Sequence, residues 1–225
     1  MSGQGQNSPI LGASRWAGEN ELESNIEWLR CICLLNAQIS FIIYSMAFIE
    51  KSMFREYDIR GRESENELNV DSMYHIARGF AATLSKHGID TAVVGHDARA
   101  TSEDFYRAAM RGLTESGISV IDIGTVTTPM SYWAQYHFGI KGLIMVTASH
   151  NPVGWNGVKL GTDLSTTLLG KEIDDLYGII EREAYVEGNG SIKKQDIQKE
   201  YFNDLLSRIS LHKKLKILIN TGNGT

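Results

Sequence analysis

The sequence predicts an α/β fold in three layers, a mixed sheet sandwiched between helices. Short apolar segments alternate with longer segments of helical periodicity between residues 71 and 183, and this alternation is typical of a parallel or mixed sheet covered by helices. The run GLIMV at 142–146 has no polar alternation, which indicates a central strand buried on both faces. With 225 residues, of which 42% are hydrophobic, the chain is long enough for a sizeable core.

The first predicted helix spans 71–88 and ends at the stop signal Gly88. Its apolar side chains share one face: Met73, Ile76, Ala77, Phe80 and Leu84. A β-branched apolar segment at 91–95 follows as a strand. The next helix is expected over 101–117, with Thr101 or Ser102 as the N-cap and two acidic residues in its first turn.

The second half of the chain repeats these signals in five further elements. They are a strand at 118–124, a helix at 128–139, a strand that begins at 142, and amphipathic helices at 171–183 and 193–209. Pro129 suits the first turn of its helix because that position needs no amide donor. A last short strand is predicted at 215–219, before a Gly-rich turn.

We expect three segments along the chain. Residues 1–45 form an extension, 46–212 form the α/β domain, and 213–225 begin a second domain that is truncated. The first 25 residues are polar and rich in Gly, Ser and Asn, so disorder is expected there. The second domain is expected because a strand and turn are usually followed by another helix or strand.

The run at 31–49 has no charged residue and approaches the length of a membrane span. Polar residues within it lower its hydrophobicity, and the segment before it is acidic, unlike the basic start of a secretory signal. A packed helix, or a non-native extension upstream of Met46, is therefore favoured. A membrane-anchored α/β binding protein stays open as an alternative of another class.

Composition narrows the classes of partner. The net charge is −5 and the basic residues are scattered, so no nucleic-acid partner is expected. Cys31 and Cys33 are the only cysteines, too close for an unstrained disulfide and too few for a metal site. Reduced thiols are typical of a cytoplasmic protein, which is the expected location.

Three polar loops follow predicted strands, at 95–99, 124–129 and 147–161. Ligands of open α/β sheets bind at the carboxyl ends of the strands, so these loops are the candidate site. The last loop, TASHNPVGWNGVKLG, brings Ser149, His150 and Lys159 into one short span.

A serine hydroxyl becomes a good nucleophile only when a neighbouring group handles its proton. Asn156 and Gly157 are a turn signal that predicts a hairpin, and the hairpin would return Lys159 beside Ser149. Pro152 stiffens the loop. These residues alone leave two interpretations open: a polar surface turn, or a nucleophile held for chemistry.

Three ordered motifs and the last residues of the chain resemble one family. TASHNP followed by NGVK resembles the phosphoserine loop of the α-D-phosphohexomutases, and FREYDIRG at 54–61 is similar to the start of their phosphomannomutase/phosphoglucomutase branch. The phosphoglucosamine mutase branch usually has FGTDGIRG instead. VVGHDARATSEDF resembles the family segment in which Asp-x-Arg follows a strand, and LINTGNGT resembles the first strand and turn of the family's second domain. The resemblance covers residues 53–225.

The resemblance implies the fold of phosphohexomutase domain I and a phosphoryl relay. The family serine carries a phosphate in the resting enzyme and gives it to a hydroxyl of a hexose monophosphate. A 1,6-bisphosphate intermediate forms, the sugar turns over, and the other phosphate returns to the serine. The implied partners are mannose or glucose phosphates, the bisphosphate and the remaining mutase domains.

The resemblance also implies a role for each matching residue. Ser149 matches the phosphoserine, Lys159 a lysine for proton exchange or phosphate contact, and Arg60 an arginine that stabilises phosphoryl charge. Tyr57 is expected to line the same site, with core packing as the alternative, and His150 is a second candidate for proton exchange.

The supporting residues are expected to shape the loop or to form a pair beside it. They are Asn151, Pro152, Asn156 and Gly157 in the loop, and Asp97 and Arg99 as an ion pair. An ordinary buried pair after a strand is the alternative for the last two.

The family binds Mg²⁺ through an oxygen of the phosphoserine and three aspartates of a DGDxDR loop, so Mg²⁺ is the implied cofactor. Ser149 would contribute one ligand through its phosphate. No DGDxDR occurs in these 225 residues, and the other ligands are expected beyond residue 225.

The chain is therefore expected to be the N-terminal piece of a four-domain mutase, inactive alone. A stand-alone, non-catalytic domain with a binding or regulatory role is the alternative, and a phosphoglucosamine mutase relative is another.

Overall fold

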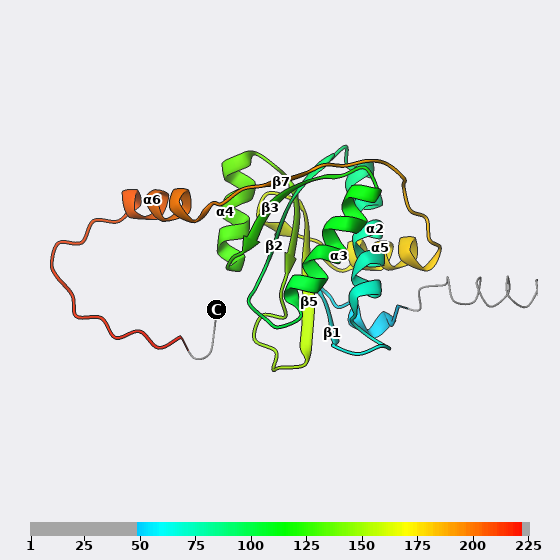
Figure 1. Ribbon diagram of the computed structural model, residues 1–225, viewed down its shortest axis with the longest axis horizontal. Helices are drawn as coiled ribbons and strands as arrows, with labels where there is room; N and C mark the ends of the chain where they lie inside the picture. Colours follow the sequence, from blue (N-terminus) through cyan, green and yellow to red (C-terminus); the bar gives the residue numbers. More distant parts are fainter. Residues whose placement is uncertain (1–48, 222–225) are drawn as a thin grey trace, which may run out of the picture. The chain divides into compact units, whose positions relative to one another are not determined.

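The computed structural model describes residues 49–221, and these residues form one mixed sheet with helices on both faces (Figure 1). The three-layer α/β fold that the sequence predicts is confirmed. The helices are η1 Lys51–Met53, α2 Val70–Lys86, α3 Ser102–Glu115, α4 Thr128–Phe138, α5 Lys171–Glu181 and α6 Gln198–Arg208. The strands are β1 Ile59–Arg62, β2 Thr91–His96, β3 Ser119–Thr125, β4 Gly142–Val146, β5 Trp155–Asp163, β6 Thr166–Thr167 and β7 Ile192–Lys194.

The strands lie in the order β1-β5-β4-β2-β3-β7, and β6 pairs with β5 outside this path. β2 pairs in parallel with β3 and β4, and β3 in parallel with β7. β5 is antiparallel to both of its main neighbours, β4 and β1. Because the chain reverses between β4 and β5, the segment that follows the central strand returns beside it at once.

The core lies on both faces of β4, as its uninterrupted apolar run predicts. All five residues of β4 are buried. Ile144 and Val146 belong to the cluster that includes α2, α3 and α5, whereas Leu143 and Met145 belong to the cluster that includes α4. Alternate side chains of one strand thus reach opposite helical layers, and Figure 1 shows α4 across the sheet from α2, α3 and α5.

The predicted helices are confirmed with small changes at their ends. α2 begins at Val70, about one turn before the first residue of its apolar stripe, Met73. Its N-cap is Asn69, whose side chain accepts a hydrogen bond from the Ser72 amide in a capping box. Pro129 lies in the first turn of α4, and Gly139 ends that helix in the left-handed conformation. Both ends follow from ordinary helix chemistry.

Two elements near the end of the chain differ from the prediction. The helix expected over 193–209 begins only at Gln198, because Ile192–Lys194 pair with β3 as β7. Helical periodicity carries no information about a nearby sheet edge, whose backbone groups bind a strand. The strand predicted at 215–219 is also wrong: no described strand pairs with these residues, which are exposed, and a strand exists only by pairing.

The predictions for the extension at 1–45 fall outside the described residues, as does all of the apolar run at 31–49 except Ile49. Within residues 49–221, no helix is long and apolar enough to cross a bilayer.

Gly157 provides a direct test of how β1 and β5 fit together. It pairs with Arg60, and a Cβ at this position would collide with the carbonyl oxygen of Ile59. We expect Gly157→Ala to lower the free energy of unfolding by about 1–3 kcal/mol, because backbone atoms of a paired strand cannot move aside easily. Urea unfolding followed by circular dichroism measures the change.

Gly178→Ala is the matched control. Gly178 lies in α5, and its Cβ would meet only the flexible end of Arg182. Alanine should raise stability there by about 0.5–1 kcal/mol, since glycine is unfavourable inside a helix. Equal effects of the two substitutions would contradict the close approach of β1 to β5.

Candidate active site

The polar loop between β4 and β5 carries several of the predicted site residues. The Thr147 amide donates to the Gly157 carbonyl at 2.9 Å, which closes the base of the loop. Ser149 has φ 58°, a left-handed conformation that residues other than glycine seldom adopt. Gly154, at φ 83°, makes a second sharp change of direction. A backbone strained in this way persists only where its surroundings hold it.

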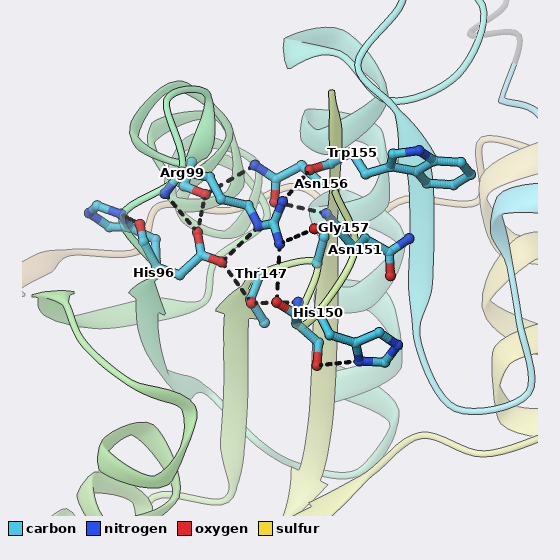
Figure 2. A network of polar contacts seen from close by, with 12 residues as sticks. His96, Arg99, Thr147, His150, Asn151, Trp155, Asn156 and Gly157 are labelled. Carbon is cyan, nitrogen blue, oxygen red and sulfur yellow. Dashed lines mark hydrogen bonds and ion pairs between the residues drawn. The ribbon is translucent and has the colours of Figure 1, made fainter. Parts of the chain in front are cut away.

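Arg99, from the loop after β2, holds the Ser149 loop by its backbone (Figure 2). One terminal nitrogen donates to the carbonyls of Pro152 at 3.2 Å and Trp155 at 3.1 Å. The other donates to the carbonyls of Ser149 at 3.1 Å and Asn151 at 2.7 Å. A planar guanidinium is suited to this task because its donors form a rigid fork.

Asp97 aims the guanidinium of Arg99. Its Oδ2 lies 3.2 Å from Arg99 Nε and accepts from the Thr147 hydroxyl at 2.8 Å, while its Oδ1 accepts from the Ser102 hydroxyl at 2.5 Å. The Thr147 hydroxyl in turn accepts from the Ser149 amide at 2.9 Å. Asp97 and Arg99 therefore form an ion pair whose other described side-chain hydrogen bonds lead to residues 147–155 or to the start of α3.

Asn156 and Gly157 do not form the predicted turn. Both lie inside β5, and the chain reverses before them, within residues 148–154. The buried amide of Asn156 donates to the hydroxyls of Thr101 at 2.9 Å and Ser102 at 3.0 Å, which ties β5 to the start of α3. In this structure Asn156 is used for side-chain hydrogen bonds and Gly157 for a close approach of two backbones. The sequence alone does not distinguish these uses from a turn.

Ser149 and His150 are both exposed at the outer side of the loop. Ser149 Oγ lies 3.3 Å from His150 Nδ1, which is near enough for the imidazole to exchange the hydroxyl proton. Although adjacent residues in extended backbone point apart, the left-handed conformation of Ser149 lets these two side chains meet.

Arg60, on β1, reaches the same loop from its other side. Its NH1 donates to the Asn151 side-chain oxygen at 2.7 Å and to the Ala148 carbonyl at 3.2 Å. Its Nε and NH2 lie 2.7 Å and 2.6 Å from Asp58 Oδ2. Arg60 is 5% exposed, so its charge is buried against this carboxylate and the residues that flank Ser149.

Lys159 lies on the same face of the sheet as Arg60. Its neighbours Val158 and Leu160 point into the core with α2, so Lys159 points to the opposite face. Its Nζ is 3.4 Å from Asp58 Oδ2 and 5.4 Å from the ring centre of Tyr57. The Tyr57 side chain is 48% exposed, which argues against the core-packing alternative for this residue.

The structure thus brings the predicted site residues together in two groups. Ser149 and His150 touch each other, and Arg60 and Lys159 share Asp58. Among the described contacts none joins Lys159 directly to Ser149; the two groups meet through Arg60, at Ala148 and Asn151.

Asp58 and Thr147 are the residues that sequence reasoning missed. Both lie inside quoted motifs, YDIRG and TASHNP. An acidic residue two positions before Arg60, in a motif offered for phosphate binding, was the available signal for Asp58.

The loop at 124–129, which follows the core of β3, contacts the end of β2 at His96. The Val126 amide donates to the His96 carbonyl at 2.9 Å, and the Thr125 hydroxyl lies 3.3 Å from His96 Nε2. Tyr106 packs on the His96 ring with centroids 4.6 Å apart. Burial, followed by its bond to Asp122, raises the pKa of Tyr106, so its hydroxyl stays protonated and donates to that carboxylate.

Comparisons with known proteins identify the family to which the chain belongs. The family described as "Phosphoglucomutase/phosphomannomutase, alpha/beta/alpha domain I" matches residues 51–187. A phosphoglucomutase of Neisseria gonorrhoeae is 38% identical over 80% of this chain and 39% of its own length. A phosphomannomutase of Vibrio cholerae is 39% identical over 78% of this chain and 39% of its own.

A crystal structure of a phosphoglucomutase/phosphomannomutase family protein from Burkholderia thailandensis shares the fold. Its TM-score is 0.69 at 31% identity, and the match covers 73% of this chain and 37% of that one. The chain therefore belongs to the phosphoglucomutase/phosphomannomutase family and contains its first α/β/α domain. It spans about two fifths of the length of the curated relatives it matches.

The fork of Arg99 provides a test of what holds the Ser149 loop. Arg99→Lys keeps the positive charge but cannot reproduce four bonds to carbonyls. We expect the free energy of unfolding to fall by about 1–3 kcal/mol. Amide hydrogen exchange across residues 148–155, measured by mass spectrometry, should become faster.

Arg107→Lys is the control, because among the described residues Arg107 pairs with Glu103, one turn away on α3, and both side chains are exposed. No measurable change in loop exchange is expected there. If exchange at 148–155 were the same in both variants, the clamp by Arg99 would not be what holds the loop.

Proposed function

We propose that this chain is the nucleophile-bearing domain of a phosphohexomutase that moves phosphate between C1 and C6 of mannose or glucose phosphate. One observation carries the proposal. Ser149 follows the buried central strand in a left-handed conformation, on a loop whose backbone is held by Arg99 and flanked by the cation of Arg60. The family of the chain supports the same chemistry.

In the proposed reaction, Ser149 carries a phosphate and transfers it to a hydroxyl of the hexose monophosphate. The bond from Oγ to phosphorus breaks and a bond from phosphorus to the sugar oxygen forms. The hydroxyl proton passes to His150, or to Lys159 when the lysine has first given up its own proton. The bisphosphate turns over, and the reverse step returns its other phosphate to Ser149 while the proton goes back to the freed sugar oxygen.

Arg60, Lys159 and Tyr57 would bind the substrate side of this step. The cations stabilise charge on the transferring phosphoryl group, which is the main contribution a protein makes to such a reaction. Tyr57 is exposed beside Lys159 and would contact the sugar. Asn151 and Pro152 would act through the loop, since their polar atoms bind Arg60 and Arg99.

Mg²⁺ is proposed as the cofactor, with a phosphate oxygen on Ser149 as its ligand from this part of the chain. Within residues 49–221, no three His, Cys, Asp or Glu side chains gather in a way that would hold a metal ion. These residues alone do not make a magnesium site, and the other ligands have to come from the remaining mutase domains.

A second candidate is a non-catalytic domain with a binding or regulatory role. The two candidates differ in whether Ser149 accepts a phosphate, and a relative of phosphoglucosamine mutase would differ from both in its preferred sugar.

Ser149→Ala in the complete protein encoded by the gene is the test. We expect mutase turnover to fall by several orders of magnitude, because the group that carries the phosphate between the two half-reactions is lost. After incubation with hexose 1,6-bisphosphate, intact-mass measurement should show one phosphoryl group on the wild type and none on the variant. Assays with mannose, glucose and glucosamine phosphates identify the substrate.

Ser165→Ala is the matched control, because Ser165 is also an exposed serine with positive φ, at 52°. It should keep wild-type turnover and phosphate content. A wild-type protein that takes no phosphate, or an active Ser149→Ala variant, would refute the proposed function.

A further inference from the structure

Asp58 is a buried carboxylate whose side-chain contacts all lead to two cations. Oδ2 lies 2.7 Å and 2.6 Å from Arg60 Nε and NH2, and 3.4 Å from Lys159 Nζ. Asp58 is 3% exposed, and its Oδ1 accepts no hydrogen bond from any described residue. Within the part of the chain that the structure describes, the carboxylate thus serves Arg60 and Lys159 and no other group.

The position of Asp58 makes both cations depend on it. Arg60 uses Nε and NH2 on Asp58, which leaves NH1 directed at Ala148 and Asn151, on either side of Ser149. Without the carboxylate, the guanidinium would keep only its NH1 end held among the described residues, and Nε and NH2 would lose the acceptor that fixes their direction. Lys159 comes from another strand, and Asp58 Oδ2 is the acidic group that joins it to Arg60.

The charges of the three groups leave one net positive charge, two from the cations and one negative from Asp58. A buried guanidinium and a partly buried ammonium side by side would repel each other without a counter-ion. With the counter-ion present, the cluster keeps enough positive charge to attract a phosphoryl group, while the cations stay in fixed directions. Preorganised charge of this kind lowers the barrier to phosphoryl transfer more than mobile charge does.

We propose that Asp58 is the positioning residue of the phosphoryl-transfer site. It holds Arg60 and Lys159 in the orientation in which they meet the phosphate of Ser149, and it makes no contact with the sugar. This inference rests on the proposed mutase function. It adds a residue whose effect on the reaction passes entirely through the two cations.

The test is Asp58→Asn in the complete protein, with kcat and KM measured for a hexose 1-phosphate. We expect kcat to fall on the order of 100-fold, as misplacement of catalytic groups typically costs. KM should stay unchanged or fall, because the cluster gains positive charge and still attracts phosphate. A folding defect alone would instead reduce the active fraction and leave the kcat of the folded protein unchanged.

Asp122→Asn is the matched control, because Asp122 is a half-buried carboxylate on β3 that binds Tyr106 and Gly124. It should leave kcat unchanged. If Asp58→Asn behaved like this control, with full kcat, the positioning role would be overturned.

A second pair of variants keeps the test decisive if Asp58→Asn does not fold. Lys159→Met combined with Asp58→Asn keeps the net charge of the cluster at one positive. Repulsion between Arg60 and a second cation is thereby avoided. Compared with Lys159→Met alone, the double variant should transfer phosphate at least about tenfold more slowly, because Arg60 has lost its support. Equal rates would overturn the proposal.

The failure of the inference differs from failure of the proposed function. If wild-type Ser149 takes no phosphate from hexose 1,6-bisphosphate, the mutase function fails. In that case, a crystal structure of the double variant tests whether Asp58 positions Arg60. Loss of the hydrogen bond from Arg60 NH1 to the Ala148 carbonyl would support the positioning role of Asp58, and retention of this bond would overturn it.

Discussion

The guanidinium of Arg99 is the contact on which the Ser149 loop depends. A loop that leaves a buried strand exposes carbonyl groups in irregular directions, and no regular pairing is available to satisfy them. Arg99 binds four of these carbonyls at once, and Asp97 fixes the guanidinium from behind. Because Asp97 also accepts from Thr147, at the end of β4, the sheet and the loop share one network. The left-handed conformation of Ser149, which costs about 1–3 kcal/mol, is stable within this network.

Two ion-pair clusters flank the Ser149 loop, and they differ in net charge. The Asp97–Arg99 pair is neutral as a unit, and both terminal nitrogens of Arg99 are used on carbonyls, so it has little left to offer a ligand. The Asp58 cluster holds two cations against one carboxylate, and Lys159 lies beside the exposed ring of Tyr57. The supporting pair is therefore on one side of Ser149, and the surplus of positive charge is on the other.

The sequence was sufficient for the helical layers and for β2, β3 and β4, because their apolar periodicity and their caps are local. It was insufficient where an element depends on a distant partner. Ile192–Lys194 become a strand only because the edge of β3 accepts them, and residues 215–219 have the composition of a strand without a described partner. The same limit applies to the site. The motif resemblance assigned Arg60 and Lys159 to the site. Asp58 lies in the same motif as Arg60, but its contact with Lys159, 101 residues away, is not visible in any local pattern.

Asn156 and Gly157 illustrate how one local signal serves two physical purposes. An Asn-Gly pair favours a tight turn because both residues tolerate positive φ, but here both are strand residues, used for what their side chains provide or omit. The Asn156 amide reaches the hydroxyls at the start of α3, and the missing side chain of Gly157 lets β1 approach β5. That approach places Arg60 opposite Gly157 and two residues from Lys159 along β5. Because Gly157 has no side chain, β1 lies close to β5 at this point. Arg60 on β1 and Lys159 on β5 are therefore near enough to share the carboxylate of Asp58.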